Sequence, residues 1–352
     1  MDLLSRSGKG RKQMQAKKTA VLDGFRIVAA LLVVAIHTSP LAGWSSEADF
    51  FLTRVLARVA VPFFFMITGQ FVVAGMLERR AGAEAHLAAY MRKLLLMYAA
   101  VTLLYLPVSL HAGYWQGGGI GSWLRMLFFD GTFYHLWYFP ACLIGLCILS
   151  ILRRFLSIQG VGRAVLVLYL VGLLGDSYYG LTQSIPFLEA VYERLFQIFS
   201  YTRNGFFYAP LFLFMGAAAG HREGGQPPKQ LSALLFFFVL LTAEAFALRY
   251  LKWQRHDSMY VMLVPVMALL YQLLVSKNQG SAKLTRTAAT GLYLLHPLGI
   301  VLVRALAKLL HAHALWIDNS LLHYVAVSCL SLIAAYGGAL ISQYRRAGKK
   351  LE

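Results

Sequence analysis

Residues 22–40 of the chain are LDGFRIVAALLVVAIHTSP, and their pattern indicates the class of protein. Ten apolar or small residues separate Arg26 from His37 in this stretch, which is typical of a membrane-spanning helix. At about 100° per residue, the step from Arg26 to His37 makes three turns plus about 20°, so both side chains share one helix face. A cation and an imidazole on one stripe indicate that this stripe faces protein or water rather than lipid.

The rest of the chain has the same apolar character. Of its 352 residues, 59% are hydrophobic and 14% are charged, whereas soluble domains carry about 25% charged residues. The formal net charge is +18, which in a polar protein would point to nucleic acid. The apolar excess argues against a nucleic-acid partner and predicts a polytopic protein whose main surroundings are the lipid bilayer.

Apolar runs near the length of a spanning helix recur along the whole sequence. We count ten of them, at about 20–39, 59–76, 94–112, 136–152, 161–176, 205–220, 231–250, 259–276, 288–308 and 324–342. The predicted fold is therefore all-α, with about ten transmembrane helices. We expect a basic arm over residues 1–19, a transmembrane domain over 20–342 and a basic tail over 343–352.

The distribution of basic residues predicts the orientation in the membrane. Most of the 33 Lys and Arg residues fall in the N-terminal arm, in alternate connections and in the C-terminal tail. Basic connections remain in the cytoplasm, so we expect both termini there and a multi-pass protein of the inner (plasma) membrane. The predicted outer connections, about 40–58, 113–135 and 177–203, are candidates for a cap over an outward-facing cleft.

The residues of the first span suggest chemistry. The neutral imidazole of His37 can accept a proton near neutral pH, as a general base must. Arg26, in the inner half of the span, could hold a phosphate or a thioester carbonyl. Two structural alternatives stay open, namely a snorkelling arginine and a histidine at the interface. Asp23 shares the face of Arg26 and could simply pair with it.

Other polar side chains of the spans are candidates for substrate binding. Glu244 lies within the seventh span, where it binds substrate or pairs with a base such as Arg26. His296 precedes Pro297, which frees a carbonyl one turn back, so His296 lines a cavity or bonds that carbonyl. Candidates at the outer ends of spans are Arg58, Arg203 and Asn204. The same applies to His135, Trp137 and Tyr138, for which an aromatic belt at the interface is the alternative. Spacing alone is poor evidence for a metal, and we predict none at the outer histidines His311, His313 and His323.

The Arg26–His37 pair behind a basic arm resembles the membrane acyltransferase 3 family. RVAVPFFFMITGQFV (58–72) is similar to the second-helix signature of that family, although Thr68-Gly69 replaces the commoner Ser-Gly. HLWYFPA (135–141) and LYLLHPL (292–298) are similar to its fourth-helix entry and its late His-Pro helix. The resemblance covers nearly the whole chain. It implies about ten spanning helices and transfer of an acyl group, usually acetyl, from cytoplasmic acyl-CoA to an extracytoplasmic acceptor.

The third span departs from the family pattern. Members often carry Arg-x-x-Arg there, which is thought to meet the CoA phosphates. This chain has Arg92 and Lys93, but Leu95 at the second arginine position. The local positive charge remains, so the resemblance assigns Arg92 and Lys93 to the donor.

Three segments resemble the membrane half of the vancomycin-resistance membrane-bound serine racemases. They are FDGTFYHLWYFPA (129–141), GDSYYG (175–180) and YTRNGFFYAPLF (201–212). A pyridoxal-phosphate domain follows the membrane half in those proteins, and this sequence ends at Glu352. We therefore predict neither racemase activity nor pyridoxal phosphate. That membrane half is thought to help serine uptake, so a transport module for a small polar solute such as L-serine is the alternative function, and a structural partner of a separate enzyme is a third.

Together these features predict an integral membrane acyltransferase. The donor that the resemblance implies is acyl-CoA, usually acetyl-CoA, and it would be held by Arg92, Lys93 and Arg26. His37 would act as general base on an acceptor hydroxyl or amine, such as that of a cell-envelope glycan, by direct transfer or through an acyl-histidine.

Overall fold

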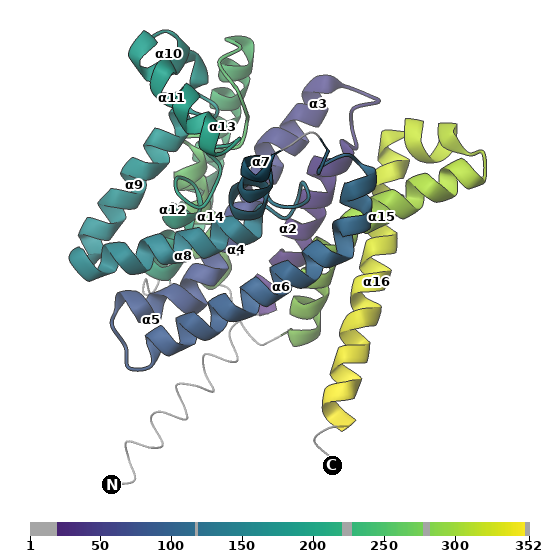
Figure 1. Ribbon diagram of the computed structural model, residues 1–352, viewed down its shortest axis with the longest axis horizontal. Coiled ribbons are helices and arrows are strands. Elements are labelled where there is room, and N and C mark those ends of the chain that lie inside the picture. The colour runs from purple at the N-terminus through teal and green to yellow at the C-terminus, as the bar shows by residue number, and fades with distance from the viewer. Residues whose placement is uncertain (1–19, 117–118, 220–226, 277–281, 349–352) are drawn as a thin grey trace. The chain divides into compact units, whose positions relative to one another are not determined.

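The computed structural model describes residues 20–116, 119–219, 227–276 and 282–348. All regular structure in these ranges is helical, which confirms the all-α class for this part of the chain. The elements are α2 (Ala20–Thr38), α3 (Ser46–Phe50), η1 (Phe51–Val55), η2 (Leu56–Val59), α4 (Ala60–Thr68), η3 (Gly69–Val73), α5 (Ala74–Leu77), α6 (Ala83–His111), α7 (Ile120–Arg125), η4 (Met126–Asp130), α8 (Tyr138–Phe155), α9 (Ile158–Leu174), α10 (Tyr179–Gln183), α11 (Pro186–Ile198), α12 (Ala209–Ala219), α13 (Pro227–Tyr250), α14 (Leu263–Ser276), α15 (Lys283–Leu309), η5 (Ala314–Asp318) and α16 (Ser320–Gly348) (Figure 1).

Seven helices of the described residues are long and apolar enough to cross a membrane. They are Ala20–Thr38, Ser46–Leu77, Ala83–His111, Tyr138–Phe155, Lys229–Tyr250, Lys283–Leu309 and Ser320–Ala347. Three shorter apolar helices, α9, α12 and α14, coincide with the other three predicted runs. These helices indicate a multi-pass membrane protein. The count of about ten spans and the cytoplasmic position of the termini stay predictions.

The second long helix begins well before the predicted boundary at residue 59. Helical structure starts at Ser46, inside the stretch that the sequence assigns to an outer connection. The Ser45 hydroxyl accepts a hydrogen bond from the Ala48 amide, and the acidic Glu47 and Asp49 lie in the first turn. A serine cap and acidic residues both stabilise a helix N-terminus. This local signal extends the helix beyond its apolar run.

The chain forms two compact units, which are described separately. Unit 1 comprises residues 1–60, 224–227 and 272–352, and unit 2 comprises residues 61–223 and 228–271. In unit 1, α15 packs along α16 and also contacts α2 (Figure 1). The buried face of α2 includes Ala29, Ala30, Val33 and Val34, whose spacing repeats at about one helical turn. The helical spacing of these apolar residues therefore gives α2 one face that packs against its neighbours in this unit.

Two glycines allow a close helix crossing in unit 2. A Cβ atom at Gly69 would lie 1.9 Å from the carbonyl oxygen of Leu213 in α12. Reciprocally, a Cβ atom at Gly216 would lie 1.9 Å from the carbonyl oxygen of Met66 in α4. Small residues allow the backbones of membrane helices to approach in this way. The Thr68-Gly69 pair of the second span thus has a packing role at its glycine.

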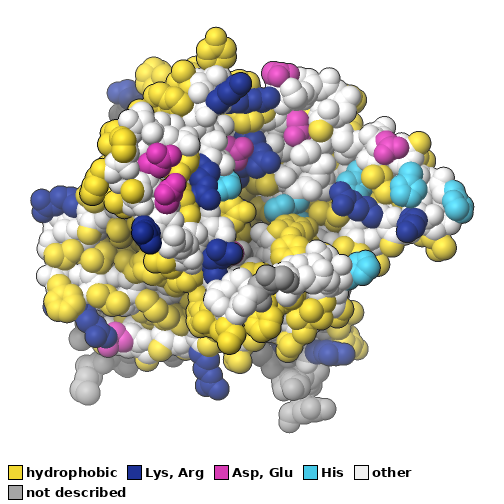
Figure 2. Space-filling model, turned by 45° about the horizontal axis from the view of Figure 1, so that its top comes forward, with side chains coloured by type: hydrophobic (Ala, Val, Ile, Leu, Met, Phe, Trp, Pro, Cys, Tyr) yellow, Lys and Arg dark blue, Asp and Glu magenta, His cyan; other side chains and the backbone are white. Residues whose placement is uncertain are grey.

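The surface carries many hydrophobic side chains, which Figure 2 shows over much of the visible face. The exposed ones include Leu103 of α6, Val239 of α13 and Ile333 of α16, with 68%, 65% and 73% of their surface accessible. Extensive exposed apolar surface marks an interaction surface, and lipid is the partner expected for long apolar helices.

Candidate functional site

The first helix presents Arg26 and His37 as the spacing predicts. Both lie in the uninterrupted helix α2, and the Arg26 side chain is 13% exposed. His37 is half-buried. Within unit 1, α2 contacts α15, α16, η1 and η2, so one face of this helix packs against protein. At Arg26 the stripe therefore faces protein rather than lipid. A snorkelling arginine would instead lie on a lipid-facing surface.

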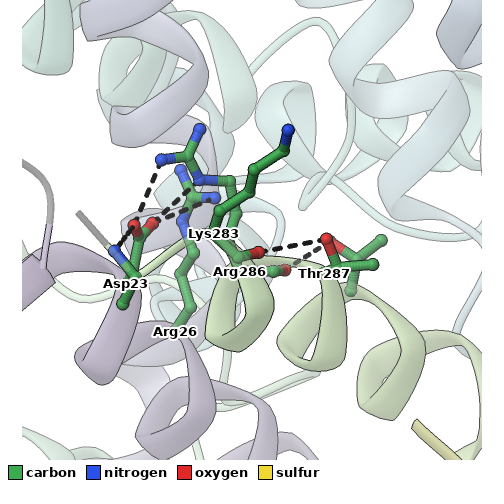
Figure 3. A network of polar contacts seen from close by, with 7 residues as sticks. Asp23, Arg26, Lys283, Arg286 and Thr287 are labelled. Atoms are coloured by element: carbon green, nitrogen blue, oxygen red, sulfur yellow. Dashed lines mark hydrogen bonds and ion pairs between the residues drawn. The ribbon is translucent and has the colours of Figure 1, made fainter. Parts of the chain in front are cut away.

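Asp23 connects the base of α2 to the start of α15. Its carboxylate is fully buried and accepts hydrogen bonds from Arg286 Nε to Oδ1 and from Arg286 Nη2 to Oδ2, both at 3.1 Å. The Ala282 amide donates to Oδ2 at 3.4 Å. Arg26 Nη1 lies 3.5 Å from Oδ1, which confirms the Asp23–Arg26 pair. Figure 3 shows both guanidinium groups beside Asp23, while the Lys283 ammonium points away.

This network has an excess of positive charge. One carboxylate serves two guanidinium groups, and the Arg286 side chain is 41% exposed. A fork-shaped guanidinium can bind a carboxylate and still present N–H groups elsewhere. The N-terminal half of α2 therefore lies beside a partly accessible cationic group as well as a structural ion pair.

The C-terminal half of α2 meets α15, the late helix of unit 1. The imidazole rings of His37 and His296 stack with centroids 5.4 Å apart and planes 20° from parallel. His296 is fully buried, and its Nδ1 lies 2.8 Å from the carbonyl oxygen of Tyr293. That carbonyl is the one freed by Pro297, four residues later. Of the two expectations for His296, the carbonyl bond is confirmed, and the ring in addition contacts the proposed base.

Aromatic and cationic side chains gather in unit 2 near the start of α8. The Arg203 guanidinium lies over the Trp137 ring at 4.8 Å and over the Tyr201 ring at 4.5 Å. Tyr138 stacks on Phe65 with centroids 4.7 Å apart. The cation–π contacts hold Arg203 in place. The structure thus brings Trp137 and Arg203 together, with Tyr138 beside them in sequence, as a candidate for binding a polar or aromatic-stacking substrate.

Two other candidates, Asn204 and Glu244, have structural partners that account for much of their polarity. The Asn204 side chain accepts from the Phe206 and Phe207 amides at 2.8 and 3.2 Å and donates to the Tyr201 carbonyl at 2.8 Å. Asn204 and Arg203 lie in the turn before α12, which begins at Ala209 rather than at the predicted residue 205. Caps of this kind satisfy amides that a helix start leaves without partners.

Glu244 has a similar role in α13. Its carboxylate accepts from the Tyr178 hydroxyl at 2.6 Å and from the Val261 and Met262 amides at 2.6 and 2.8 Å. Those amides directly precede α14, so Glu244 stabilises its N-terminus. The partner that the sequence suggested for Glu244, Arg26, pairs with Asp23 instead. His135 is also fully enclosed, 1% exposed, against the ring of Tyr105 at 5.0 Å.

The remaining candidates are dispersed. Arg92 and Lys93 are exposed side chains well inside α6 of unit 2, because this helix begins at Ala83 rather than at residue 94. Arg58 is buried in the short helix η2 of unit 1, which contacts α2. Among the described residues, no group of three or more His, Cys, Asp or Glu side chains could hold a metal ion.

Two polar residues with structural partners, Arg286 and Asp176, were not among the candidates predicted from the sequence. Arg286 was assigned to a connection, although it lies four positions into α15 and pairs with Asp23. Asp176 is fully buried, and its Oδ1 accepts from the Ser258 and Met259 amides at 2.7 and 2.9 Å. An acidic residue at the end of an apolar run was the available signal for Asp176.

The comparisons with known proteins show the family of the chain. The family model described as an acyltransferase domain matches residues 20–340. The chain belongs to the acyltransferase 3 family. The match extends from the start of α2 into α16, so it includes both members of the His37–His296 stack. No solved structure matches the chain.

The curated relatives of this acyltransferase 3 chain carry racemase names. Two proteins of Enterococcus faecalis named amino-acid racemase are 37% identical over 316 residues and 38% identical over 320 residues. Each match covers 89% of this chain, but 44% and 45% of the relatives. A protein of Enterococcus gallinarum named serine/alanine racemase is 34% identical over 330 residues, covering 90% of this chain and 45% of the relative. The chain spans less than half the length of these relatives.

Proposed function

We propose that this chain is an integral membrane acyltransferase that moves an acyl group, in particular acetyl, from cytoplasmic acyl-CoA to an extracytoplasmic acceptor. The acceptor is a hydroxyl or amine, such as that of a cell-envelope glycan. The membership of the acyltransferase 3 family supports the class of reaction. The single observation that carries the assignment to this site is the placement of Arg26 and His37 on one protein-facing stripe of α2.

His37 is the general base of the proposed reaction. It takes the proton from the acceptor hydroxyl or amine as the acceptor oxygen or nitrogen bonds to the acyl carbon. The carbon–sulfur bond of the thioester breaks, and the proton passes from His37 to the leaving thiolate. Alternatively, His37 first accepts the acyl group itself and the acceptor then removes it. Both routes end with the acylated acceptor and free CoA thiol.

Cationic side chains bind the donor in this proposal. Arg26 stabilises the phosphate or carbonyl oxygens of the donor, because its guanidinium is held by Asp23 next to Arg286. Arg92 and Lys93 attract the phosphates from the cytoplasmic side, which their exposure permits. Acceptor contacts come from the other candidate side chains, namely Arg58, His135, Trp137, Tyr138, Arg203, Asn204 and Glu244.

Membrane vesicles with labelled acetyl-CoA test the assignment. Label should move to extracted envelope material, and His37→Ala should lower the rate by about 100-fold or more, as for loss of a general base. Thr38→Ala serves as the matched control, because Thr38 is the next residue and its hydroxyl only bonds the Val34 carbonyl at 2.9 Å. Undiminished transfer by His37→Ala would refute the role of His37.

A second function is favoured by the names of the relatives. A membrane module that carries a small amino acid such as L-serine would suit proteins named amino-acid racemase and serine/alanine racemase. It would act without acyl-CoA, through the polar cluster around Trp137 and Arg203. Proteoliposomes loaded with buffer separate the two functions. Uptake of labelled serine without acetyl-CoA, and without label transfer, would favour the carrier.

A further inference from the structure

We infer that His296 is a positioning residue for His37, whose ring it orients and whose protonated form it stabilises. This inference rests on the proposed function of His37 as general base. The two residues lie 259 positions apart on α2 and α15, and their rings stack at 5.4 Å with planes 20° from parallel. His296 therefore contacts the ring of His37 directly, and in this inference it acts through that contact.

The backbone of α15 fixes the ring of His296. Its Nδ1 lies 2.8 Å from the Tyr293 carbonyl oxygen, which can only accept a hydrogen bond. Nδ1 therefore carries the hydrogen, and Nε2 is the acceptor nitrogen of the neutral ring. The Tyr293 carbonyl is available because Pro297 has no amide hydrogen. The His296-Pro297 pair thus holds the imidazole in one orientation, with its Nδ1 hydrogen directed at the Tyr293 carbonyl.

A fixed neutral ring beside His37 matters at the moment of proton transfer. When His37 accepts the acceptor's proton, it becomes a cation against the face of an aromatic ring, which is a favourable contact. Two adjacent imidazolium ions would repel, so the pair holds one extra proton. Because His296 is fully buried and His37 is half-buried, this proton belongs to His37.

The other charged and titratable groups of unit 1 do not replace this contact. Arg26 lies on the same stripe, about 16 Å from His37 along the helix axis. Arg58, in η2, is a further cation on an element that contacts α2. The Tyr293 ring lies 6.2 Å from that of His296. η1 adds Arg54, and the other charged groups of α15 are Lys283, Arg286, Arg304 and Lys308. On α16, which contacts both α2 and α15, the titratable groups are His323, Tyr324, Cys329, Tyr336 and Tyr344, with Arg345 and Arg346 at its end. Among the described residues of α2 and of the elements named here, the acid is Asp23, which lies about 21 Å from His37 along the helix axis and pairs with Arg26 and Arg286.

Two substitutions of His296 separate stacking from simple filling of space. His296→Phe keeps an aromatic ring at the position, whereas His296→Leu keeps apolar volume without a ring. In the vesicle assay we expect His296→Leu to lower kcat by about threefold to tenfold with an unchanged KM for acetyl-CoA, the size of one cation–aromatic contact. His296→Phe should keep most of the activity. Equal activities of the two variants, whether both high or both low, would overturn the inference.

Nitrogen NMR of the full chain with labelled histidine, reconstituted in lipid, gives a readout that needs no catalysis. The His37 signals are assigned by their loss in His37→Asn. In His296→Leu, the protonation midpoint of His37 should fall by about half a pH unit relative to wild type and to His296→Phe. An unchanged midpoint in a variant that still folds would contradict the stacking role. If wild type transfers no label but the midpoint shifts, the proposed function fails while the pairing of the two histidines stands.

Discussion

Substitution of Asp23 tests how strongly the first helix is held to α15. Asp23→Ala removes the fully buried carboxylate that binds Arg286 through two hydrogen bonds and Arg26 through an ion pair. Loss of one partner of a buried ion pair costs about 3–5 kcal/mol, whereas an exposed pair is worth about 0–1 kcal/mol.

The environments of the two arginines place the expected loss in free energy of unfolding between these limits. Arg286 is 41% exposed and can turn toward water after the change, while Arg26 is 13% exposed and loses its ion pair where little water reaches it. We therefore expect the free energy of unfolding to fall by about 2–3 kcal/mol. Asp23→Asn should cost less, because one amide oxygen still accepts a hydrogen bond from an arginine.

Unfolding in mixed micelles with increasing SDS, followed by circular dichroism, measures this change. A double-mutant cycle with Arg286→Ala should give a coupling energy above about 1 kcal/mol, since the residues are in direct contact. Glu84→Ala is the matched control, because Glu84 is an exposed acidic residue in the first turn of α6. A coupling energy near zero, or equal losses for Asp23→Ala and Glu84→Ala, would refute the reasoning.

Two further substitutions test the packing and capping in unit 2. Gly69→Ala places a Cβ atom 1.9 Å from the Leu213 carbonyl oxygen and should lower stability by about 1–3 kcal/mol or more in the same unfolding measurement. Gly24→Ala is the control and should leave stability unchanged or slightly raised, because nothing lies within 4 Å of the added atom. Equal losses of stability for Gly69→Ala and Gly24→Ala would contradict the close approach of Gly69 to α12. Glu244→Ala removes the acceptor of two amide hydrogens and one hydroxyl hydrogen, so it should lower the free energy of unfolding by about 2 kcal/mol. Glu244→Gln should lower it less, and equal losses for the two variants would argue against the role of Glu244 at the start of α14.

The spacing of residues along the helices predicted several local features of the site. Arg26 and His37 share a face because eleven positions nearly complete three turns of a helix. The Asp23–Arg26 pair and the bond from His296 to a carbonyl one turn back are likewise confirmed, because both arise within a single helix. Short-range geometry follows directly from sequence, since helix dimensions are nearly constant.

Other features arise only where separate helices meet. The apolar run of the second span gave its boundary as residue 59, but the Ser45 cap extends the helix to Ser46. The sequence suggested a distant arginine as the partner of Glu244, but its carboxylate instead accepts hydrogen bonds from the amides that precede α14. Apolar content predicts which residues enter a membrane, but it does not say which polar groups meet one another there.

The sequence by itself determined the class of fold, the helical stripe of Arg26 and His37, and the carbonyl bond of His296, because each depends on local spacing and on hydrophobicity. Only the tertiary structure decided that Arg286 shares the carboxylate of Asp23 and that the ring of His296 stacks on His37. Both contacts join α2 to α15 across more than 250 positions of sequence. Both contacts depend on how the two helices pack and how each is rotated about its axis. The spacing of residues within a single helix does not reveal that packing.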